Sequence, residues 1–318
     1  MKRMITVSLV ALSGLGLGAC VSSMAYTSKV EAAYPAEGRQ IDVGGHDVHV
    51  LERGPGTAPV VLMIHGASAN AREFTGTLAP RLETDMRVLM ADRPGHGYSE
   101  RFDGAETLAA QARQMAGLLD QLAPDQKAVI VGHSFGGAVA LRIALDRPDL
   151  VSGLVLLAPV THDWGEGSGT AWYNSIAANP VFGPVFSQFV PIIGPSQMKD
   201  GISSVFAPAP TPQGYYQNSG LGLLLRPPNF RANAQDMTRL KDELAQQSAR
   251  YGDLSVPITV FSGSKDTVLS PKLHAVRLKK QVPVEMVILP DEGHMPHHGE
   301  GSAVAGAIRR LAFGRQTR

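Results

Sequence analysis

The chain has 318 residues, 44% of them hydrophobic and 18% charged, which is enough apolar material for one large core or two modest ones. Because 29 basic and 28 acidic side chains nearly cancel, the composition does not point to a nucleic acid or another strongly charged partner. The single cysteine, Cys20, excludes an intramolecular disulfide and a cluster of thiolate metal ligands.

The N-terminus has the pattern of an export signal. Lys2 and Arg3 form a basic start, and residues 4–17 form an apolar run too short to span a bilayer comfortably. The following Leu-Gly-Ala-Cys ends at Cys20 and resembles the bacterial lipoprotein signal, in which the cysteine carries a diacylglycerol. We therefore expect a signal peptide over residues 1–19 and lipidation of Cys20.

This signal predicts an exported protein attached to a membrane. Val21 rather than aspartate follows the cysteine, which favours the outer membrane and its periplasmic side in a two-membrane bacterium. Two alternatives stay open, an ordinary cleaved signal peptide that releases a secreted protein and an uncleaved anchor over residues 4–26. Residues 20–37 are small and polar without clear periodicity, so we predict a coil tether there with a reach of roughly 20–25 Å.

The first folded part, residues 38–160, alternates strand and helix patterns. Alternating polar and apolar residues around Gly44 and Gly45 predict a β-hairpin. Continuous apolar runs, typical of strands buried on both faces, follow further along the chain. Strands are predicted at residues 59–66, 87–91, 128–131 and 152–159, and helices at 107–122 and 138–145. This order predicts an α/β fold with a mostly parallel, doubly wound sheet.

The alternation stops after the sixth predicted strand. Residues 161–251 are rich in Pro, Gly, Ser and aromatics and show only short helical stretches. The α/β pattern resumes over residues 252–318 with two more strands and two helices. We therefore predict a helical cap inserted over the carboxyl edge of the sheet, between the two parts of one core.

Ser134 is the first candidate catalytic residue. It lies in V-G-H-S-F-G-G at residues 131–137, between a predicted buried strand and a predicted helix. A serine on such a corner adopts a strained backbone, and neighbouring glycines leave room for the sharp turn. This is the G-x-S-x-G pattern of a nucleophile elbow.

A serine nucleophile needs a base, and the base needs an orienting acid. His294 follows the last predicted strand in D-E-G-H, and Asp266 follows the strand before it in G-S-K-D. The carboxyl ends of both strands lie at the same edge as Ser134, so we predict a Ser134–His294–Asp266 triad. Asp163, just past an earlier strand, is the alternative acid.

The chain resembles the α/β-hydrolase superfamily, in its cap-bearing, serine-nucleophile branch of esterases and lipases. The resemblance covers about residues 38–311 and rests on motifs that follow one another in the family's order. These motifs are H-G-A-S at 65–68, D-R-P-G-H-G-Y-S at 92–99, G-H-S-F-G-G at 132–137, G-S-K-D at 263–266 and G-H at 293–294. It implies the α/β-hydrolase fold and hydrolysis through an acyl-enzyme.

The resemblance also implies an oxyanion hole made by the backbone N–H groups of Ala67 and Phe135. Ser68 could add a hydroxyl. We expect neither a cofactor nor a metal, although His294, His297 and His298 form an H-x-x-H-H cluster. No carboxylate stands at a convincing ligand spacing from it, so these histidines are better explained by a loop or a helix start.

The predicted function is hydrolysis of small carboxylic esters by a serine hydrolase. A serine triad on this fold also serves acyltransferases, haloperoxidases or perhydrolases, and C–C bond hydrolases, and one chain does not separate them. The non-enzymatic alternative is a lipoprotein that binds an acyl ligand without turnover.

Aromatic side chains in the cap predict the substrate class. Trp172, Phe182, Phe186 and Phe189 lie close together, and no charged residue occurs over residues 173–198. If these side chains line the acyl pocket, uncharged apolar acyl groups are the preferred substrates. Packing of the cap onto the core, or contact with lipid, are the alternative roles of this stretch.

Overall fold

The computed structural model of the chain describes residues 2–167 and 170–314, and over residues 2–15 it describes the helical backbone alone. Met1 in the expected signal peptide, residues 168–169 in the cap and residues 315–318 at the end of the core lie outside the described residues.

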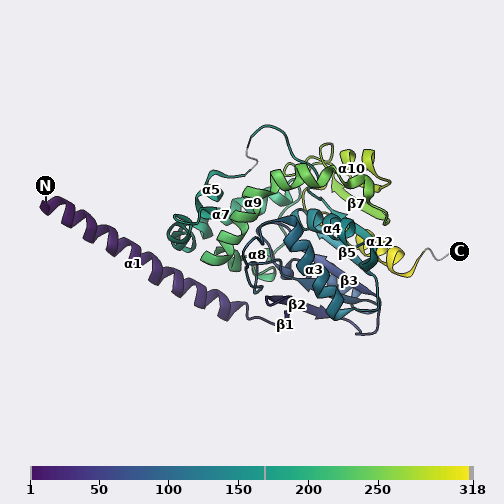
Figure 1. Ribbon diagram of the computed structural model, residues 1–318, viewed down its shortest axis with the longest axis horizontal. Coiled ribbons are helices and arrows are strands. Elements are labelled where there is room, and N and C mark those ends of the chain that lie inside the picture. Colours follow the sequence, from purple (N-terminus) through teal and green to yellow (C-terminus); the bar gives the residue numbers. More distant parts are fainter. Residues whose placement is uncertain (1, 168–169, 315–318) are drawn as a thin grey trace.

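A single eight-stranded sheet forms the centre of the molecule (Figure 1). Its strands stand in the order β1-β2-β4-β3-β5-β6-β7-β8, and only the β1–β2 and β2–β4 pairs are antiparallel. The strands are β1 Arg39–Asp42, β2 Asp47–Arg53, β3 Val60–Ile64, β4 Arg87–Ala91, β5 Ala128–His133, β6 Val151–Leu157, β7 Ile258–Gly263 and β8 Glu285–Leu289. The predicted mostly parallel, doubly wound sheet is confirmed.

Two apolar cores lie on opposite faces of this sheet. Successive side chains of a strand point to opposite faces, so Leu62 of β3 joins one core and Met63 the other. The first core is completed mainly by α3 (Leu108–Leu122), α4 (Phe135–Asp146) and α10 (Ala275–Gln281). The second is completed by η1 (Ala71–Phe74), α2 (Ala79–Leu82) and α12 (Gly301–Phe313). The continuous apolar runs in the sequence follow from this two-sided burial.

The chain between β6 and β7 forms a group of helices over the sheet. They are α5 Trp172–Ala178, α6 Gly183–Phe186, η3 Ser187–Phe189, α7 Val190–Phe206, α8 Tyr215–Asn218, η4 Leu221–Leu225, α9 Pro227–Ser248 and η5 Tyr251–Asp253. The expectation of only short helical stretches is wrong, because α7 has 17 residues and α9 has 22. Both begin with Pro in the first turn, where its missing N–H costs nothing, and α9 has neither Gly nor Pro after Pro228.

The predicted coil tether is also wrong over most of its length. Helix α1 runs from Lys2 to Ala33 and leaves the body of the molecule as one long rod (Figure 1). Its second half buries Ala19, Ser23 and Val30, which share one helical face, and packs against α7, η3 and η4. Contacts with a distant part of the chain therefore fix a segment whose own sequence shows no apolar stripe.

Two polar contacts hold α1 in place. The Tyr26 hydroxyl donates to the carbonyl of Gly222 at 3.1 Å, and Arg226 forms an ion pair with Glu31 at 2.7 Å.

Within the described residues no single helix has the length and apolarity needed to cross a membrane. The helices Trp172–Ala178 and Gly183–Phe206, bent by 114° relative to each other, meet that test only when they are taken together.

Candidate active site

Ser134 occupies the sharp corner between β5 and α4. Its φ of 50° and ψ of −114° lie in a region that L-residues rarely adopt, a strain of about 1–3 kcal/mol that functional sites often store. The corner needs its glycines: a Cβ on Gly136 would stand 2.1 Å from the carbonyl oxygen of Ile64, and one on Gly132 2.4 Å from that of Gly136. Ser134 is half-buried between the buried His133 and Phe135, so the turn presents its side chain to the site.

The predicted acid and base are paired. Asp266 Oδ2 lies 2.8 Å from His294 Nδ1, and both side chains are buried. Asp266 Oδ1 accepts the backbone N–H groups of Val268 and Leu269, each at 2.8 Å, which fixes the carboxylate. Because an ionised carboxylate only accepts, a neutral His294 ring would donate Nδ1–H to Asp266 and leave the lone pair on Nε2.

The alternative acid has a different partner. Asp163 Oδ1 accepts the N–H of Gly165 at 3.0 Å, which closes a turn at the start of the cap. In the described part of the chain, no hydrogen bond joins Ser134 Oγ to His294. Such contacts often tighten only when substrate is bound, so the nucleophile–base contact stays a prediction.

The backbone of His294 is held from two sides. Its N–H donates to the carbonyl of Val205 near the end of α7 at 3.1 Å, and its own carbonyl accepts Nε2 of His133 at 3.0 Å. Burial keeps the pKa of His133 well below its ordinary value, so this ring is neutral and serves as a donor. The residue before the nucleophile therefore anchors the residue predicted to be its base.

The two predicted oxyanion donors flank Ser134. Phe135 is the first residue of α4, where a backbone N–H has no partner within the helix. Ala67 follows Gly66, at which a Cβ would lie 3.1 Å from Cβ of Ser134. Neither N–H donates to another described residue. The N–H of Ser68 is already used, since it donates to Asn233 Oδ1 at 2.7 Å.

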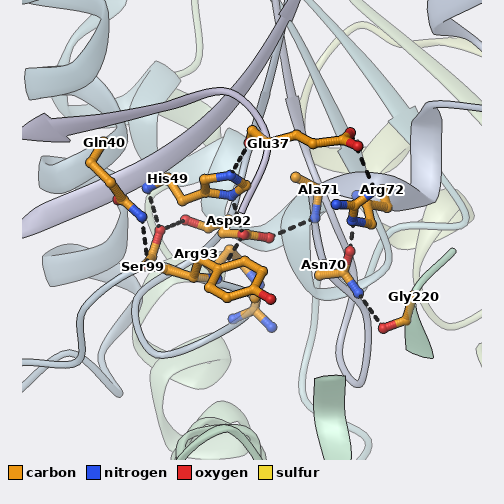
Figure 2. A network of polar contacts seen from close by, with 12 residues as sticks. Glu37, Gln40, His49, Asn70, Ala71, Arg72, Asp92, Arg93, Ser99 and Gly220 are labelled. Atoms are coloured by element: carbon orange, nitrogen blue, oxygen red, sulfur yellow. Dashed lines mark hydrogen bonds and ion pairs between the residues drawn. The ribbon is translucent and has the colours of Figure 1, made fainter. Parts of the chain in front are cut away.

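Asp92 organises the neighbouring loops (Figure 2). Its carboxylate accepts the N–H of Ala71 at 2.7 Å and that of Tyr98 at 2.9 Å, and it pairs with His49 Nδ1 at 2.7 Å. Burial would raise the pKa of this carboxyl, but the hydrogen bonds from His49 and the Ala71 N–H and the attraction of the nearby histidines together outweigh burial and hold the pKa below its ordinary value. Asp92 thus braces the loops beside the site.

Arg93, the next residue, connects the site to the cap. Its guanidinium donates to Asp236 of α9 at 2.5 Å and to the carbonyl of Gly66 at 3.1 Å, and it lies 4.2 Å from the ring centroid of Phe135. Sequence reasoning missed Asp236, because nothing near it in the chain marks it. The one available signal was the arginine of the D-R-P-G-H-G-Y-S motif, because an arginine that folds into the interior requires a buried acceptor.

The H-x-x-H-H cluster meets a carboxylate that sequence reasoning also missed. Glu73 of η1 is buried beside α11 (Pro296–Gly299), with His297 Nε2 at 2.8 Å and His298 Nε2 at 3.4 Å. Its other oxygen accepts the Tyr215 hydroxyl at 2.9 Å. Glu73 and the two histidines could hold a divalent cation by residue type. Burial raises the pKa of Glu73, but the hydrogen bond from His297 and the attraction of the surrounding histidines together hold it well below its ordinary value.

The four predicted substrate-binding side chains are not equivalent. Trp172 and Phe182 are 71% and 66% exposed, whereas Phe186 and Phe189 are half-buried. In the described residues none of the four makes a ring contact with the predicted triad, and Trp172 packs instead on Tyr173. An open groove of about 760 Å³ between α1 and the cap, lined among others by Met24, contains none of them. Their role in binding stays a prediction.

Cys20 lies on the exposed side of α1, and its thiol is free. It is therefore accessible to modification, and the expected lipidation and export stay predictions.

Comparison with known proteins assigns the family. The model of the alpha/beta hydrolase family matches residues 61–307. Lipase LipV of Mycobacterium tuberculosis is 42% identical over 113 residues, which cover 36% of this chain and 42% of that protein. An esterase of Thermogutta terrifontis, 23% identical, has the same fold with a TM-score of 0.66 over 86% of this chain and 99% of that one. A bacterial membrane phospholipase A is 21% identical with a TM-score of 0.68, and the alignment covers all of both chains. The chain therefore belongs to the alpha/beta hydrolase family.

Proposed function

We propose that this hydrolase is a serine hydrolase that cleaves carboxylic esters of apolar acyl groups through an acyl-enzyme. The observation that carries the proposal is the buried Asp266–His294 pair, 2.8 Å apart, at the sheet edge that also bears the strained Ser134. A buried imidazole oriented by a carboxylate, together with a half-buried serine at a strand–helix corner, suits acyl transfer.

The proposed reaction has two halves. Ser134 Oγ attacks the ester carbonyl while His294 Nε2 takes the hydroxyl proton, and the N–H groups of Ala67 and Phe135 receive the developing oxyanion. His294 then gives the proton to the leaving alcohol as the ester C–O bond breaks. Water attacks the acyl-enzyme with His294 as base, which releases the acid and restores Ser134.

A fluorophosphonate probe tests the nucleophile directly. Wild-type protein should be labelled and Ser134→Ala should not, while Ser68→Ala, which removes the other serine hydroxyl of the predicted site, should keep its labelling. Equal labelling of the wild type and Ser134→Ala would refute the assignment.

A p-nitrophenyl ester series tests substrate class. Each buried methylene can add up to about 0.8 kcal/mol, so we expect kcat/KM to rise from acetate through butyrate to hexanoate. A flat profile or a preference for charged acyl groups would contradict the apolar pocket. Absence of turnover at every chain length would favour the acyl-binding lipoprotein, and transfer of the acyl group to an added alcohol would favour an acyltransferase.

We propose further that the protein is exported and held at a membrane through Cys20 or an uncleaved N-terminal anchor. Exposed apolar side chains support a location beside lipid: Val181, Phe182 and Val185 of the cap are each at least 63% exposed, and Met24 of the adjoining α1 is 66% exposed. A single-site Cys20→Ser variant should lose lipid labelling and leave the membrane fraction. Unchanged attachment would favour the uncleaved anchor.

A further inference from the structure

One face of α9 points polar side chains into the site. Asn233 and Asp236 stand three residues apart, so they share a helical face, and they are 5% and 0% exposed. Buried polar side chains of this kind are costly unless their partners are in place. Their partners belong to the core and lie beside the two predicted oxyanion donors.

Asn233 acts on the Ala67 side. Its Oδ1 accepts the N–H of Ser68, the residue directly after Ala67, at 2.7 Å. Ser68 has a φ of 58°, which an L-residue adopts only when its surroundings enforce it. The hydrogen bond that the Ser68 N–H donates to the cap therefore holds a strained turn, and that turn sets the direction of the Ala67 N–H.

Asp236 acts on both donors through Arg93. Its carboxylate binds Arg93 at 2.5 Å and Arg101 at 2.8 Å. Arg93 in turn donates to the carbonyl of Gly66, the residue before Ala67, and covers the ring of Phe135. The buried Arg93 guanidinium thus contacts the residue before one predicted oxyanion donor, Ala67, and the side chain of the other, Phe135.

We propose that Asn233 and Asp236 are positioning residues, through which cap helix α9 sets the geometry of the oxyanion hole. This inference rests on the proposed function for its kinetic consequence, but its structural content, a loop at residues 65–70 fixed from the cap, does not. The cap then has a catalytic task besides covering substrate.

The chain contains a matched control on the same helix. Asn229 is 6% exposed, and its Nδ2 donates to the carbonyls of Gly95 at 2.9 Å and Gly97 at 3.1 Å, outside the oxyanion loop. Asn233→Ala and Asn229→Ala therefore remove the same chemical group from the same buried cap–core interface. Only the first removes the acceptor of the Ser68 N–H.

We expect Asn233→Ala to lower kcat for p-nitrophenyl butyrate about 10-fold or more, with KM changed less than about twofold, because an oxyanion donor acts mainly on the transition state. Asn229→Ala should keep kcat within about twofold of wild type. Asn233→Asp, which retains an acceptor oxygen at the same place, should recover most of the loss.

Amide hydrogen exchange gives a readout that does not need turnover. Exchange over residues 65–70 should accelerate in Asn233→Ala and stay unchanged there in Asn229→Ala. Equal kcat losses in the two alanine variants, or unchanged exchange over residues 65–70 in Asn233→Ala, would overturn the inference. Failure of the proposed function would appear separately, as equal probe labelling of the wild type and Ser134→Ala.

Discussion

The cap consists of two unlike halves, one built into the core and one turned away from it. Helix α9 inserts Asn233 and Asp236 into buried hydrogen bonds and ion pairs with core loops. Helices α5 to α7 instead leave Trp172, Phe182 and Ile193 between 58% and 71% exposed. One insertion therefore serves two purposes. Its fixed half supports the site, and its apolar half is available to something outside the molecule.

The largest expected effect lies at the site that the fixed half supports. Asp266→Asn should lower kcat about 10³–10⁴-fold with little change in unfolding free energy, because the neutral amide no longer orients the imidazole or stabilises its charged form. Asp163→Asn is the matched control and should stay within about twofold of wild type. Ester-hydrolysis kinetics on both variants decide between the two acids, and the reverse pattern would make Asp163 the triad acid.

The next effect concerns the stability of the elbow. Gly136→Ala should destabilise the fold by about 3 kcal/mol or more, since its Cβ would meet the Ile64 carbonyl oxygen at 2.1 Å, a clash that only backbone movement relieves. Urea unfolding measures the loss. A variant as stable as wild type would show that the backbone at this corner can shift to accept a Cβ. The elbow would then not be a rigid part of the site that α9 supports.

Acid should loosen the junction where the cap leaves the core. The N–H of Thr161, the first cap residue, donates to His274 Nδ1 at 3.2 Å, and burial lowers the pKa of His274 to about 4. Because the unfolded chain takes up this proton near pH 6.5, stability is full above that pH and falls by roughly 3 kcal/mol as pH drops toward 4.

Urea unfolding between pH 7 and 4 tests this loss. His274→Asn should flatten the profile over the same range. An unchanged slope in that variant would assign the acid sensitivity to other buried histidines.

The exposed half should show its role in vesicle binding. Phe182→Asp should weaken binding of the full chain to phospholipid vesicles by roughly tenfold, the order expected when one large apolar side chain no longer enters lipid. Val268→Asp, a 46% exposed apolar position just after β7, is the control and should bind as wild type does. Flotation assays measure vesicle binding of both variants. Equal binding by the two variants would contradict a contact between lipid and the α5 to α7 segment.

The smallest effect has the opposite sign. Gly201 lies inside α7, and a Cβ added there would have no atom within 4 Å, so Gly201→Ala should stabilise the fold by about 0.5–1 kcal/mol through helix propensity. Thermal unfolding measures the gain. A loss instead would mean that α7 needs a flexible point, which would sharpen the contrast with the rigid elbow.

The local sequence pattern predicted those parts of the molecule whose structure is determined by residues close to them in the sequence. The strands β3 and β5 are continuous apolar runs because helices cover both faces, and the elbow at Ser134 carries its glycines within the same short stretch. The strand ends placed Asp266 and His294 at one sheet edge, although Asp163 met the same criterion and stayed open as an alternative. None of these required knowledge of a distant partner.

Most of the missed features depend on contacts between distant residues. The helical α1 is held by Tyr26 and Gly222, which are 196 positions apart, and Ser68 and Asn233 are 165 apart. Glu73 meets His297 across 224 positions. No window along the chain contains both members of such a pair, so composition suggested a coil at α1. Helix α9 had a local signal in its Pro start and its run without Gly or Pro, but the Pro- and Gly-rich composition of the whole cap segment obscured it.

The second half of α1, packed against the cap, is a rigid connection between Cys20 and the body of the molecule. From Cys20 to Ala33 a helix measures about 21 Å at its usual rise of 1.5 Å per residue, which is close to the mean reach of a coil of that length, but a helix has no slack. Any attachment at Cys20 therefore determines the direction in which the body faces as well as its distance from the attachment. Rotation of the helix at Cys20 would therefore reorient the cap together with it, whereas a flexible linker would let the cap rotate independently of the attachment point.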